Sequence, residues 1–348
     1  MSAVRSGSGV GVRGTAPMEE DDMSLRWGIL GTGGIARKMV AAARARGGEV
    51  AAVGSGDPAR AAAFAEEHGI ARHHGRHHDL LARPEDVDVV YVATTNDRHH
   101  ADALACIEAG VPVLVEKPFT LDLEQAEEVA AAARTAGVFC MEAMWMRFQP
   151  AFLEVERRIA AGHIGEPLLV QADFGIAATP DTDRRWFARE LGGGALLDVG
   201  VYPLTFATGL LGTPERAFAL GELADSGVDA TVAVAMRHGG GRLSSWSCSF
   251  VADTGVEATV SGAEGSLRVH GPFHHAGRLT LRQGSTVVEE HDLQGTEAGF
   301  EYEVDEVVRC LEDGRTESPR MPLALSLTTL RWLDELRRQV GVTYPHED

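Results

Sequence analysis

The first part of the chain alternates short apolar runs with amphipathic stretches. The runs have the length of buried strands, and the stretches between them have the hydrophobic spacing of helices. The predicted strands are Leu25–Gly31, Glu49–Gly54, Val87–Ala93, Val111–Val115 and Val138–Glu142. The predicted helices are Ile35–Ala45, Pro58–His68, His100–Ala109 and Leu123–Thr135. Because continuous apolar strands alternate with helices, we predict an α/β domain with a parallel sheet covered on both faces.

The hydrophobic pattern changes after Trp145. From there, apolar and polar residues alternate along segments separated by glycine-containing turns, which is typical of an antiparallel sheet with one covered face. The predicted strands are Glu166–Gly175, Ala217–Glu222, Asp229–Arg237, Gly241–Phe250, Val256–Ser261, Ser266–His270, Arg278–Arg282 and Thr286–Glu290. Helical spacing is found in Gly193–Leu211, Glu301–Glu312 and Leu323–Val340. We therefore predict two domains, at residues 24–144 and 145–348, the second of them α+β.

Residues 1–23 follow neither pattern. They are rich in Gly and Ser and lack the run of about 7–15 apolar residues that a secretory signal contains. We expect a disordered tail, or an upstream start codon with Met23 as the more natural start.

Composition and charge exclude several classes of partner. The chain has 348 residues and a net charge of 32 − 51 = −19, which disfavours binding to nucleic acid or to anionic membranes. We find no uninterrupted apolar run near the roughly 18 residues of a membrane span. The four cysteines lie far apart without a C-x-x-C motif, so neither a disulfide framework nor a zinc cage is indicated. We expect a cytoplasmic protein of enzyme size.

A glycine-rich loop follows the first predicted strand. Residues 31–36, GTGGIA, match the pattern G-x-G-x-x-G/A and open the first helix. Gly31 permits the tight turn, Gly33 lets backbone N–H groups approach a pyrophosphate, and Ala36 allows close helix–strand packing. The loop predicts a dinucleotide site whose first contacts are Gly31, Gly33, Gly34, Ile35 and Ala36.

The end of the second strand bears on the choice between NAD and NADP. An acidic residue there would bind the ribose 2′-hydroxyl of NAD and repel a 2′-phosphate, but this chain has Ser55 at that position. Arg60 lies in the first turn of the next helix, within reach of a phosphate. Asp57 is the alternative acid, although its position also suits an N-cap. We favour NADP, with NAD left open.

Two histidine-rich segments invite comparison with metal sites. His73–His78 contains histidines at i,i+4 spacing, but Gly75 weakens a helix there and no acidic or cysteine ligands accompany it. We predict a solvated loop and no metal site, and the same for His274–His275.

Several further motifs together resemble one known family. Val113–Phe119 has the sequence VLVEKPF, Ala93–Asn96 and His99 precede it, and Gly192–Tyr202 has the sequence GGGALLDVGVY. With the glycine loop, these motifs resemble the Gfo/Idh/MocA oxidoreductase family from Leu25 to the C-terminus. Four other segments are similar to the branch that includes trans-dihydrodiol dehydrogenases and bacterial D-xylose 1-dehydrogenases: Met141–Trp145, the G-x-Y ending at Tyr202, Glu317–Pro319 and Gly341–Pro345.

The resemblance implies a fold, a cofactor and catalytic residues. It implies a Rossmann domain followed by an open antiparallel sheet that forms a homodimer, and NADP held by Ser55 and Arg60. This chain departs from many relatives by having Gly56 in place of an arginine. Lys117 is the implied catalytic lysine, in front of a cis Pro118, and Tyr202 is the implied acid/base.

The proposed chemistry makes definite demands on these side chains. Oxidation of a secondary alcohol or sugar hemiacetal needs a proton acceptor beside the nicotinamide. A free tyrosine has a pKa of about 10, so we expect the Lys117 ammonium to lower the pKa of Tyr202. Asp198 lies four residues before Tyr202 on the same predicted helix face, where it can orient the lysine, bind a substrate hydroxyl or serve packing. Pro203 predicts a kink there.

Other polar residues are candidates for the nicotinamide end of the site. Thr94, Asn96, His99 and Glu116 lie at or just after the carboxyl ends of predicted parallel strands, where open α/β sheets bind ligands. Side chains that either shape the substrate pocket or serve packing are Trp145, Arg147, Arg185 and Trp186.

We thus predict an NAD(P)-dependent oxidoreductase for a small-molecule sugar, polyol or trans-dihydrodiol. The alternatives are a catalytically silent nucleotide-binding or redox-sensing protein on the same fold, and an oxidoreductase that keeps its cofactor bound.

Overall fold

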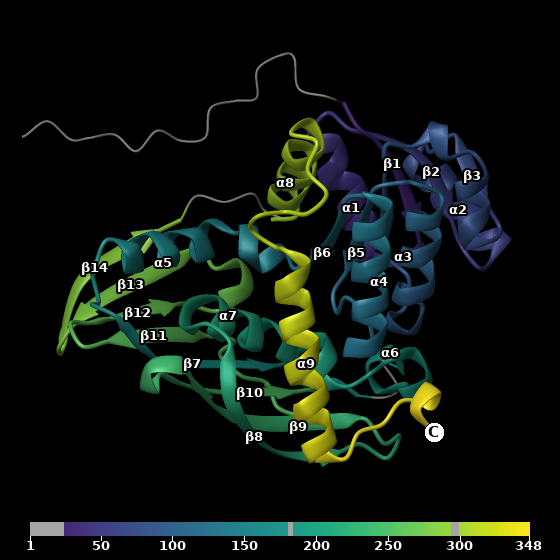
Figure 1. Ribbon diagram of the computed structural model, residues 1–348. Helices are drawn as coiled ribbons and strands as arrows, with labels where there is room; N and C mark the ends of the chain where they lie inside the picture. Colours follow the sequence, from purple (N-terminus) through teal and green to yellow (C-terminus); the bar gives the residue numbers. More distant parts are fainter. Residues whose placement is uncertain (1–23, 180–183, 294–298) are drawn as a thin grey trace, which may run out of the picture.

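The computed structural model describes residues 24–179, 184–293 and 299–348 (Figure 1). The predicted tail, residues 1–23, lies outside the described residues. Two sheets with their helices stand side by side, and helix α9 (Leu323–Val340) runs along the junction between them. It packs against α4 (Leu123–Ala136) on one side and β8 (Pro214–Leu223) on the other.

The first sheet has six parallel strands in the order β3-β2-β1-β4-β5-β6. The strands are β1 (Arg26–Leu30), β2 (Glu49–Gly54), β3 (Arg72–His74), β4 (Val89–Val92), β5 (Val113–Glu116) and β6 (Cys140–Ala143). Their helices are α1 (Gly34–Ala45), α2 (Pro58–His68), α3 (His99–Glu108) and α4. This order is that of a doubly wound Rossmann sheet, and it confirms the predicted fold class. Strand order reverses between β1 and β4, which is where such sheets open a ligand crevice.

Local chemistry explains where two of these helices begin and end. The Asp57 carboxylate accepts hydrogen bonds from the backbone N–H groups of Ala59 and Arg60, at 2.8 and 3.2 Å, and Pro58 occupies the first helical position of α2. In α4, Asp122 caps the N-terminus in the same way, and Gly137 ends the helix in the left-handed conformation. The predicted capping role of Asp57 is therefore confirmed.

The second sheet has eight strands in the order β14-β13-β12-β11-β7-β10-β9-β8. The strands are β7 (Pro167–Gly175), β8, β9 (Asp229–His238), β10 (Leu243–Ser249), β11 (Ala258–Gly262), β12 (Ser266–Val269), β13 (Arg278–Gln283) and β14 (Thr286–Asp292). Neighbouring strands are antiparallel except β7 and β10, which pair in parallel. The predicted α+β second half is confirmed, with that one parallel pair as an addition.

Helices cover one face of this sheet, and one of the later helices packs against the first domain. The remaining helices are α5 (Pro150–Ala160), α6 (Arg184–Phe187), α7 (Val201–Leu211) and α8 (Glu301–Glu312). Helix α7 packs on β7, and α8 packs against α1 of the first sheet (Figure 1). Neither β3 nor α5 was predicted from the sequence pattern.

The predicted helix Gly193–Leu211 is interrupted. Leu196–Gly200 forms a π-helical turn, and regular α-helix begins only at Val201. Pro203 has no N–H group to donate to the carbonyl of Asp198 or Val199 one turn back, so the helix departs from α geometry beside it. The kink predicted from Pro203 takes the form of this turn.

One helical segment also meets the length and hydropathy of a membrane span. Within the described part of the chain this segment is Arg189–Leu211, and 89% of its most apolar stretch is buried inside the fold. The segment is not an uninterrupted apolar run, because it contains Arg189, Glu190 and Asp198, and its burial makes it part of the core.

The two histidine segments match the predicted solvated loops only in part, because His73, His78 and His275 are exposed and the other histidines are partly buried. His74 ends strand β3, and His77 begins a 3₁₀ turn, His77–Ala82, with its ring against the segment after β2. His274 and His275 lie in another 3₁₀ turn, Phe273–His275, where their rings pack against Trp145 at centroid distances of 5.4 and 5.3 Å. The partly buried histidines depart from the prediction because they contact segments distant in the sequence.

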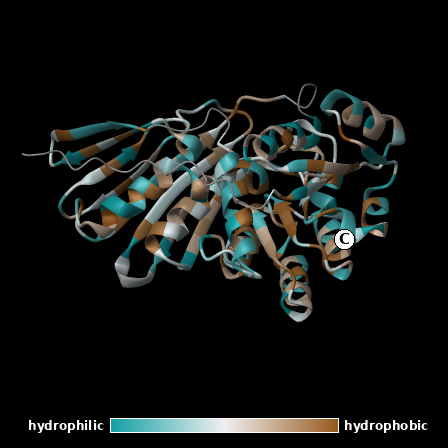
Figure 2. Cartoon of the chain, turned by 90° about the horizontal axis from the view of Figure 1, so that it is seen from above, coloured by the Kyte–Doolittle hydropathy of each residue, from teal (hydrophilic) through white to brown (hydrophobic). Residues whose placement is uncertain are grey.

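The uncovered face of the eight-stranded sheet carries large apolar side chains. Phe218, Leu220 and Leu243 are 58%, 83% and 50% exposed. Burial alternates along β8 and β9, so that one set of side chains enters the core and the other faces outward, and in the middle of both strands the two sets are apolar. Hydrophobic segments occur in both halves of the molecule (Figure 2).

Candidate active site

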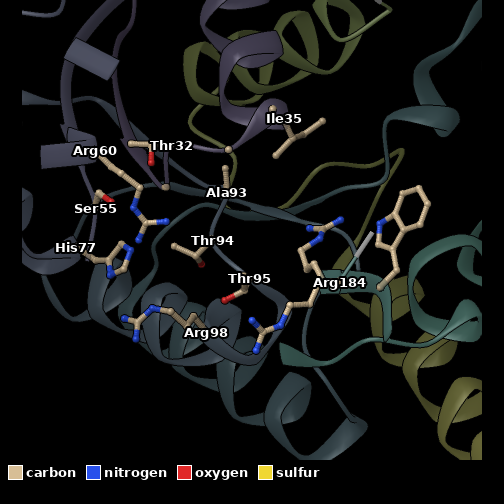
Figure 3. A pocket seen from close by; sticks show the side chains of 15 residues that line it. Thr32, Ile35, Ser55, Arg60, His77, Ala93, Thr94, Thr95, Arg98 and Arg184 are labelled. Atoms are coloured by element: carbon tan, nitrogen blue, oxygen red, sulfur yellow. The ribbon is translucent and has the colours of Figure 1, made fainter. Parts of the chain in front are cut away.

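A groove of about 810 Å³ opens at the carboxyl edge of β1, β2 and β4 (Figure 3). Its floor and walls come from the glycine loop, the end of β2, the segment after β4 and helix α6. The lining residues are Gly31, Thr32, Gly33, Gly34, Ile35, Ser55, Arg60, His77, Ala93, Thr94, Thr95, Arg98, Arg184, Arg185 and Trp186. Seven of the predicted cofactor contacts therefore line one groove: Gly31, Gly33, Gly34, Ile35, Ser55, Arg60 and Thr94. Ala36, the remaining residue predicted from the glycine loop, is buried.

The glycines of the loop differ in why they are needed. Gly31 has φ +107°, and a Cβ there would lie 2.3 Å from the carbonyl oxygen of Ala93, so the fold itself requires glycine. A Cβ at Gly33 or Gly34 would meet nothing within 4 Å. Their lack of side chains leaves space above the N-terminus of α1, where a pyrophosphate can reach backbone N–H groups. Ala36 is fully buried and serves helix–sheet packing.

Basic side chains gather at the end of the groove next to β2. Arg60 and Arg98 approach it from opposite sides, with His77 and Ser55 between them (Figure 3). The His77 ring accepts a hydrogen bond from the Gly56 N–H at its Nε2, 3.1 Å away, and a Cβ at Gly56 would lie 3.1 Å from its Cε1. Burial lowers the pKa of His77, and Arg98 and Arg60 lower it further. His77 therefore occupies the space beside Gly56.

A buried carboxylate anchors this end of the groove. Asp102 on α3 accepts hydrogen bonds from Arg98 Nη2 and Thr94 Oγ1, both at 2.8 Å, and it also contacts His78 Nε2 at 2.8 Å. Its position holds Arg98 and Thr94 at the edge of the groove. Sequence reasoning identified neither Arg98 nor Asp102, because no motif marks them.

At the opposite end, Lys117 and Asp198 form an ion pair. Lys117 Nζ donates to Asp198 Oδ1 at 2.6 Å and to the Asp198 carbonyl oxygen at 2.7 Å. That carbonyl is available because Pro203, five residues on, has no N–H to donate in the π-helical register. Burial lowers the pKa of Lys117, but Asp198, Tyr202 and Glu116 outweigh it and the pKa is raised. Burial raises the pKa of Asp198, but Lys117 and Arg185 outweigh it and the pKa is lowered. Both groups are charged.

Tyr202 lies beside this ion pair. Lys117 Nζ is 5.3 Å from the centroid of its ring, and its hydroxyl oxygen accepts a hydrogen bond from Trp145 Nε1 at 2.7 Å. Burial raises the pKa of Tyr202 to about 12, against the opposing effects of Lys117 and of the Trp145 hydrogen bond. The prediction that Lys117 gives Tyr202 a low pKa was therefore wrong in its net direction, because the cost of burying a phenolate exceeds the attraction of the ammonium.

The remaining predicted residues stand around Lys117. A cavity of about 100 Å³, bordered by Ile35, Thr94 and Arg185 of the main groove, is also lined by Asn96, His99, Glu116, Lys117 and Asp198. Their hydrogen bonds show how each is held. Asn96 Nδ2 donates to the Gly192 carbonyl at 2.8 Å and so joins the two halves. His99 Nδ1 lies 2.8 Å from the carbonyl oxygen of Pro118, which follows a cis peptide as expected.

Glu116 is hydrogen-bonded to the backbone of Lys117. Its carboxylate accepts hydrogen bonds from the Tyr91 hydroxyl and, at 3.1 Å, from the Lys117 N–H. Burial raises the pKa of Glu116. Within residues 24–179, 184–293 and 299–348, no group of three or more His, Cys, Asp or Glu side chains is placed to hold a metal ion.

Aromatic rings enclose Tyr202 on its other side. Phe174 and His274 lie 5.3 and 5.0 Å from its ring centroid, and Phe300 stacks on Trp145 at 4.5 Å. Trp145 was predicted only as a residue of the pocket or of packing, and His274 was predicted to be solvated. These aromatic residues come from separate elements of the chain, so no local sequence pattern predicts that they meet around Tyr202.

Comparison with known proteins gives the family. Residues 25–144 match the family of Gfo/Idh/MocA oxidoreductases with an NAD-binding Rossmann fold, and residues 152–268 match the C-terminal domain of the same family. Trans-1,2-dihydrobenzene-1,2-diol dehydrogenases from Danio rerio and Homo sapiens are 37% and 33% identical to the chain, and each match covers 93% of this chain and 99% of the relative.

Solved structures agree with this relationship. The 3-ketoreductase KijD10 from Actinomadura kijaniata, crystallised with NADP and TDP-benzene, has a TM-score of 0.83 at 27% identity, covering 92% of this chain and 99% of that one. An aldose–aldose oxidoreductase from Caulobacter crescentus shares the fold at 24% identity, with a TM-score of 0.82 over 91% of this chain and 97% of that one. The chain belongs to the Gfo/Idh/MocA oxidoreductase family and is an NAD(P)-dependent dehydrogenase.

Proposed function

We propose that the chain is an NADP-preferring dehydrogenase of a sugar, polyol or trans-dihydrodiol, with Tyr202 as acid/base and Lys117 as its partner. The observation that carries this proposal is the buried Lys117–Asp198 ion pair, which lies beside Tyr202 at one end of a dinucleotide-sized groove. When bound, a nicotinamide dinucleotide supplies or accepts the hydride. The protein must then move a proton and hold the substrate oxygen.

Lys117 has the donors to hold that oxygen. An ammonium group has three N–H donors, and two of them are used by the carbonyl and carboxylate of Asp198. The third is available to a substrate oxygen in the small cavity that Lys117 lines. Because Asp198 keeps the ammonium charged and fixed, Lys117 stabilises negative charge that develops on the oxygen.

Tyr202 has the protonation state of an acid in the direction of carbonyl reduction. With a pKa of about 12 it is a phenol at neutral pH and can donate its proton to the oxygen of a carbonyl whose carbon is gaining a hydride. In the direction of alcohol oxidation, the phenolate accepts the alcohol proton. We expect the oxidation rate therefore to rise with pH, since only the phenolate can act as the base.

The preference for NADP rests on the charge of the groove. A 2′-phosphate placed beyond β2 would lie among Ser55, Arg60, His77 and Arg98. Of the acids near this end, Asp57 already caps α2 and contacts Arg60 at 3.4 Å, and Asp102 is hydrogen-bonded to Arg98 and Thr94. Charge-assisted hydrogen bonds from guanidinium groups are the usual means of holding a phosphate. Gly56, where many relatives have arginine, leaves Arg60 and Arg98 to provide most of this attraction.

We also propose that two copies pair through the uncovered face of the eight-stranded sheet. Exposed apolar side chains such as Phe218, Leu220 and Leu243 lie on it, and large apolar surfaces of this kind seldom remain in water. Light scattering should give twice the chain mass for the wild type, and the chain mass for Leu220→Lys with Phe218→Glu. The proposed location is the cytoplasm, in keeping with four unpaired, buried cysteines.

The decisive experiment is a substrate panel. Aldoses, inositols and trans-dihydrodiols are each incubated with NADP and with NAD, and the absorbance of the reduced nicotinamide is followed. We expect turnover of at least one class, with a lower KM for NADP than for NAD. Absence of turnover in either direction, with nucleotide still bound, would favour a catalytically silent protein on this fold.

A further inference from the structure

Among the residues that the structure describes, Trp145 is the hydrogen-bond partner of the Tyr202 hydroxyl. Its indole Nε1 lies 2.7 Å from the phenol oxygen, and the two side chains are 8% and 5% exposed. An indole N–H can only donate, so the phenol oxygen must be the acceptor in this hydrogen bond. The hydroxyl proton of Tyr202 has no acceptor in that part of the chain.

The position of Trp145 is itself firmly determined. Trp145 follows β6 and begins the 3₁₀ turn Trp145–Phe148. Its ring is stacked on Phe300 with an interplanar angle of 8°, and His275 is stacked at 28°. Gln149 Nε2 donates to the Trp145 carbonyl at 3.3 Å and to that of Gly299 at 2.7 Å. The indole can therefore not turn away from Tyr202 without disturbing these contacts.

We propose that Trp145 is a positioning residue that gives Tyr202 its direction as a proton donor and stabilises the phenolate that remains. This inference rests on the proposed function and adds a residue to it. In carbonyl reduction the substrate carbon gains the hydride, and its oxygen gains the proton of Tyr202. The electron pair of the broken O–H bond stays on the phenol oxygen, which accepts a hydrogen bond from the indole N–H of Trp145. In alcohol oxidation the same steps run in reverse.

A phenolate at Tyr202 depends on the indole N–H of Trp145 as its hydrogen-bond donor. Lys117 lies over the ring of Tyr202 and directs two of its N–H groups to Asp198, not to the phenol oxygen. The neighbouring Phe174 and His274 make ring contacts with Tyr202. A hydrogen bond to an ionised group is stronger than one to a neutral group, so the Trp145 contact strengthens when the proton leaves.

The first test uses cofactor-free protein and does not depend on turnover. Tyrosine is replaced throughout by 3-fluorotyrosine, the ¹⁹F resonances are titrated with pH, and Tyr202→Phe identifies the signal of Tyr202. Trp145→Phe keeps an aromatic ring on Phe300 but removes the N–H, and we expect it to raise the apparent pKa of Tyr202 by at least about one pH unit.

Phe174→Leu is the matched control. It removes another aromatic neighbour of Tyr202, 5.3 Å away, without removing a hydrogen bond. We expect it to leave the pKa of Tyr202 within a few tenths of the wild-type value. The proposal is overturned by an unchanged pKa in Trp145→Phe, or by an equal rise in Phe174→Leu, which would indicate a packing effect only.

The second test uses turnover. In alcohol oxidation, Trp145→Phe should move the rising limb of the pH–rate profile to higher pH by the same amount, so that high pH restores the rate. In a Tyr202→Phe background the substitution should cause no further loss. An equal fold-loss in both backgrounds would contradict the proposal. If no substrate is turned over, the proposed function fails while the ¹⁹F titration still decides the role of Trp145.

Discussion

The two ends of the groove hold charge in different ways. At the phosphate end, Arg60 has a side chain that is 68% exposed, and the glycine loop offers backbone N–H groups. At the catalytic end, the side chains of Lys117 and Asp198 are 14% and 9% exposed, and both are fixed by hydrogen bonds. The first end attracts a mobile anion from water, whereas the second holds a charged group in a set direction.

This difference has an energetic consequence. Exposed charges are screened by water and salt, so each contributes little alone. A buried charge is costly to separate from its partner, so removing one member leaves the other unpaired. We therefore expect substitutions at the catalytic end to have large effects on rate and stability, and substitutions at the phosphate end to have small effects on cofactor affinity.

The largest effect is expected from Lys117→Met. Turnover should fall by roughly 10²–10⁴, because the donor to the substrate oxygen and the charge beside Tyr202 are both lost. The unpaired Asp198 should also destabilise the fold by about 3–5 kcal/mol. Steady-state rates and urea denaturation measure the two effects.

Two controls separate these effects. Lys38→Met removes the only other lysine of the chain, which is exposed, and should change turnover only a few-fold. Adding Asp198→Asn to Lys117→Met removes the unpaired charge, and should restore stability but not turnover. Full activity in Lys117→Met would show that the catalytic end has been misidentified.

The next effect concerns Glu142, a fully buried residue of β6 below the Lys117 loop. Its carboxylate accepts a hydrogen bond from the Phe119 N–H at 3.1 Å, and burial raises its pKa to about 7. Because the folded pKa lies above the unfolded one, the folded state binds the proton more tightly. The associated stability is present below about pH 4.5 and is lost as pH rises through about 7, by about 3 kcal/mol in all.

Glu142→Gln tests this dependence. Its amide oxygen can still accept the Phe119 N–H, and it does not titrate. Urea denaturation at pH 5 and pH 8 should show a smaller loss of stability in Glu142→Gln than in the wild type. Glu85→Gln, at an exposed position, should behave as the wild type does. Parallel pH dependence in Glu142→Gln and wild type would mean that Glu142 does not titrate in this range.

At the phosphate end, Arg60→Ala should raise the KM for NADP about tenfold, the value of one charge-assisted hydrogen bond. The KM for NAD should hardly change, because NAD has no 2′-phosphate. Initial rates with both cofactors give the comparison. An equal rise in both KM values would place Arg60 against the pyrophosphate or in a structural role instead.

The smallest effect is expected from salt. Raising the ionic strength from about 0.05 to 0.5 M should weaken NADP binding a few-fold, because the cations at that end are accessible to counterions. The value of kcat should stay nearly constant, since the Lys117–Asp198 pair is shielded from solvent. A kcat that falls more than the affinity would reverse the proposed contrast between the two ends.

The same contrast decides how much the sequence could predict. The glycine loop, the Asp57 cap and Ser55 with Arg60 lie within short segments whose local spacing implies their geometry, and the structure places all of them at the groove or its edge. The alternation of hydrophobic residues likewise predicted both sheets.

The catalytic end depends on contacts across the chain. Lys117 and Asp198 are 81 residues apart, and Trp145 and Tyr202 are 57 apart. The helical spacing of Asp198 and Tyr202 left several roles open. Pro203 predicted a kink, but no local pattern indicated that the kink would be a π-helical turn. The predicted low pKa of Tyr202 failed for a related reason, because the depth of burial follows from the surrounding rings of Phe174 and His274, which periodicity alone does not reveal.

The most direct test of the account is single-turnover carbonyl reduction by Tyr202→Phe. NADPH oxidation is followed with the ketone or aldehyde of whichever substrate class the panel identifies, and NADPH affinity is measured separately by fluorescence. We predict that the rate falls by roughly 10²–10⁴ while the affinity for NADPH is unchanged, because only the proton donor is lost. A rate equal to that of the wild type would contradict Tyr202 as the acid.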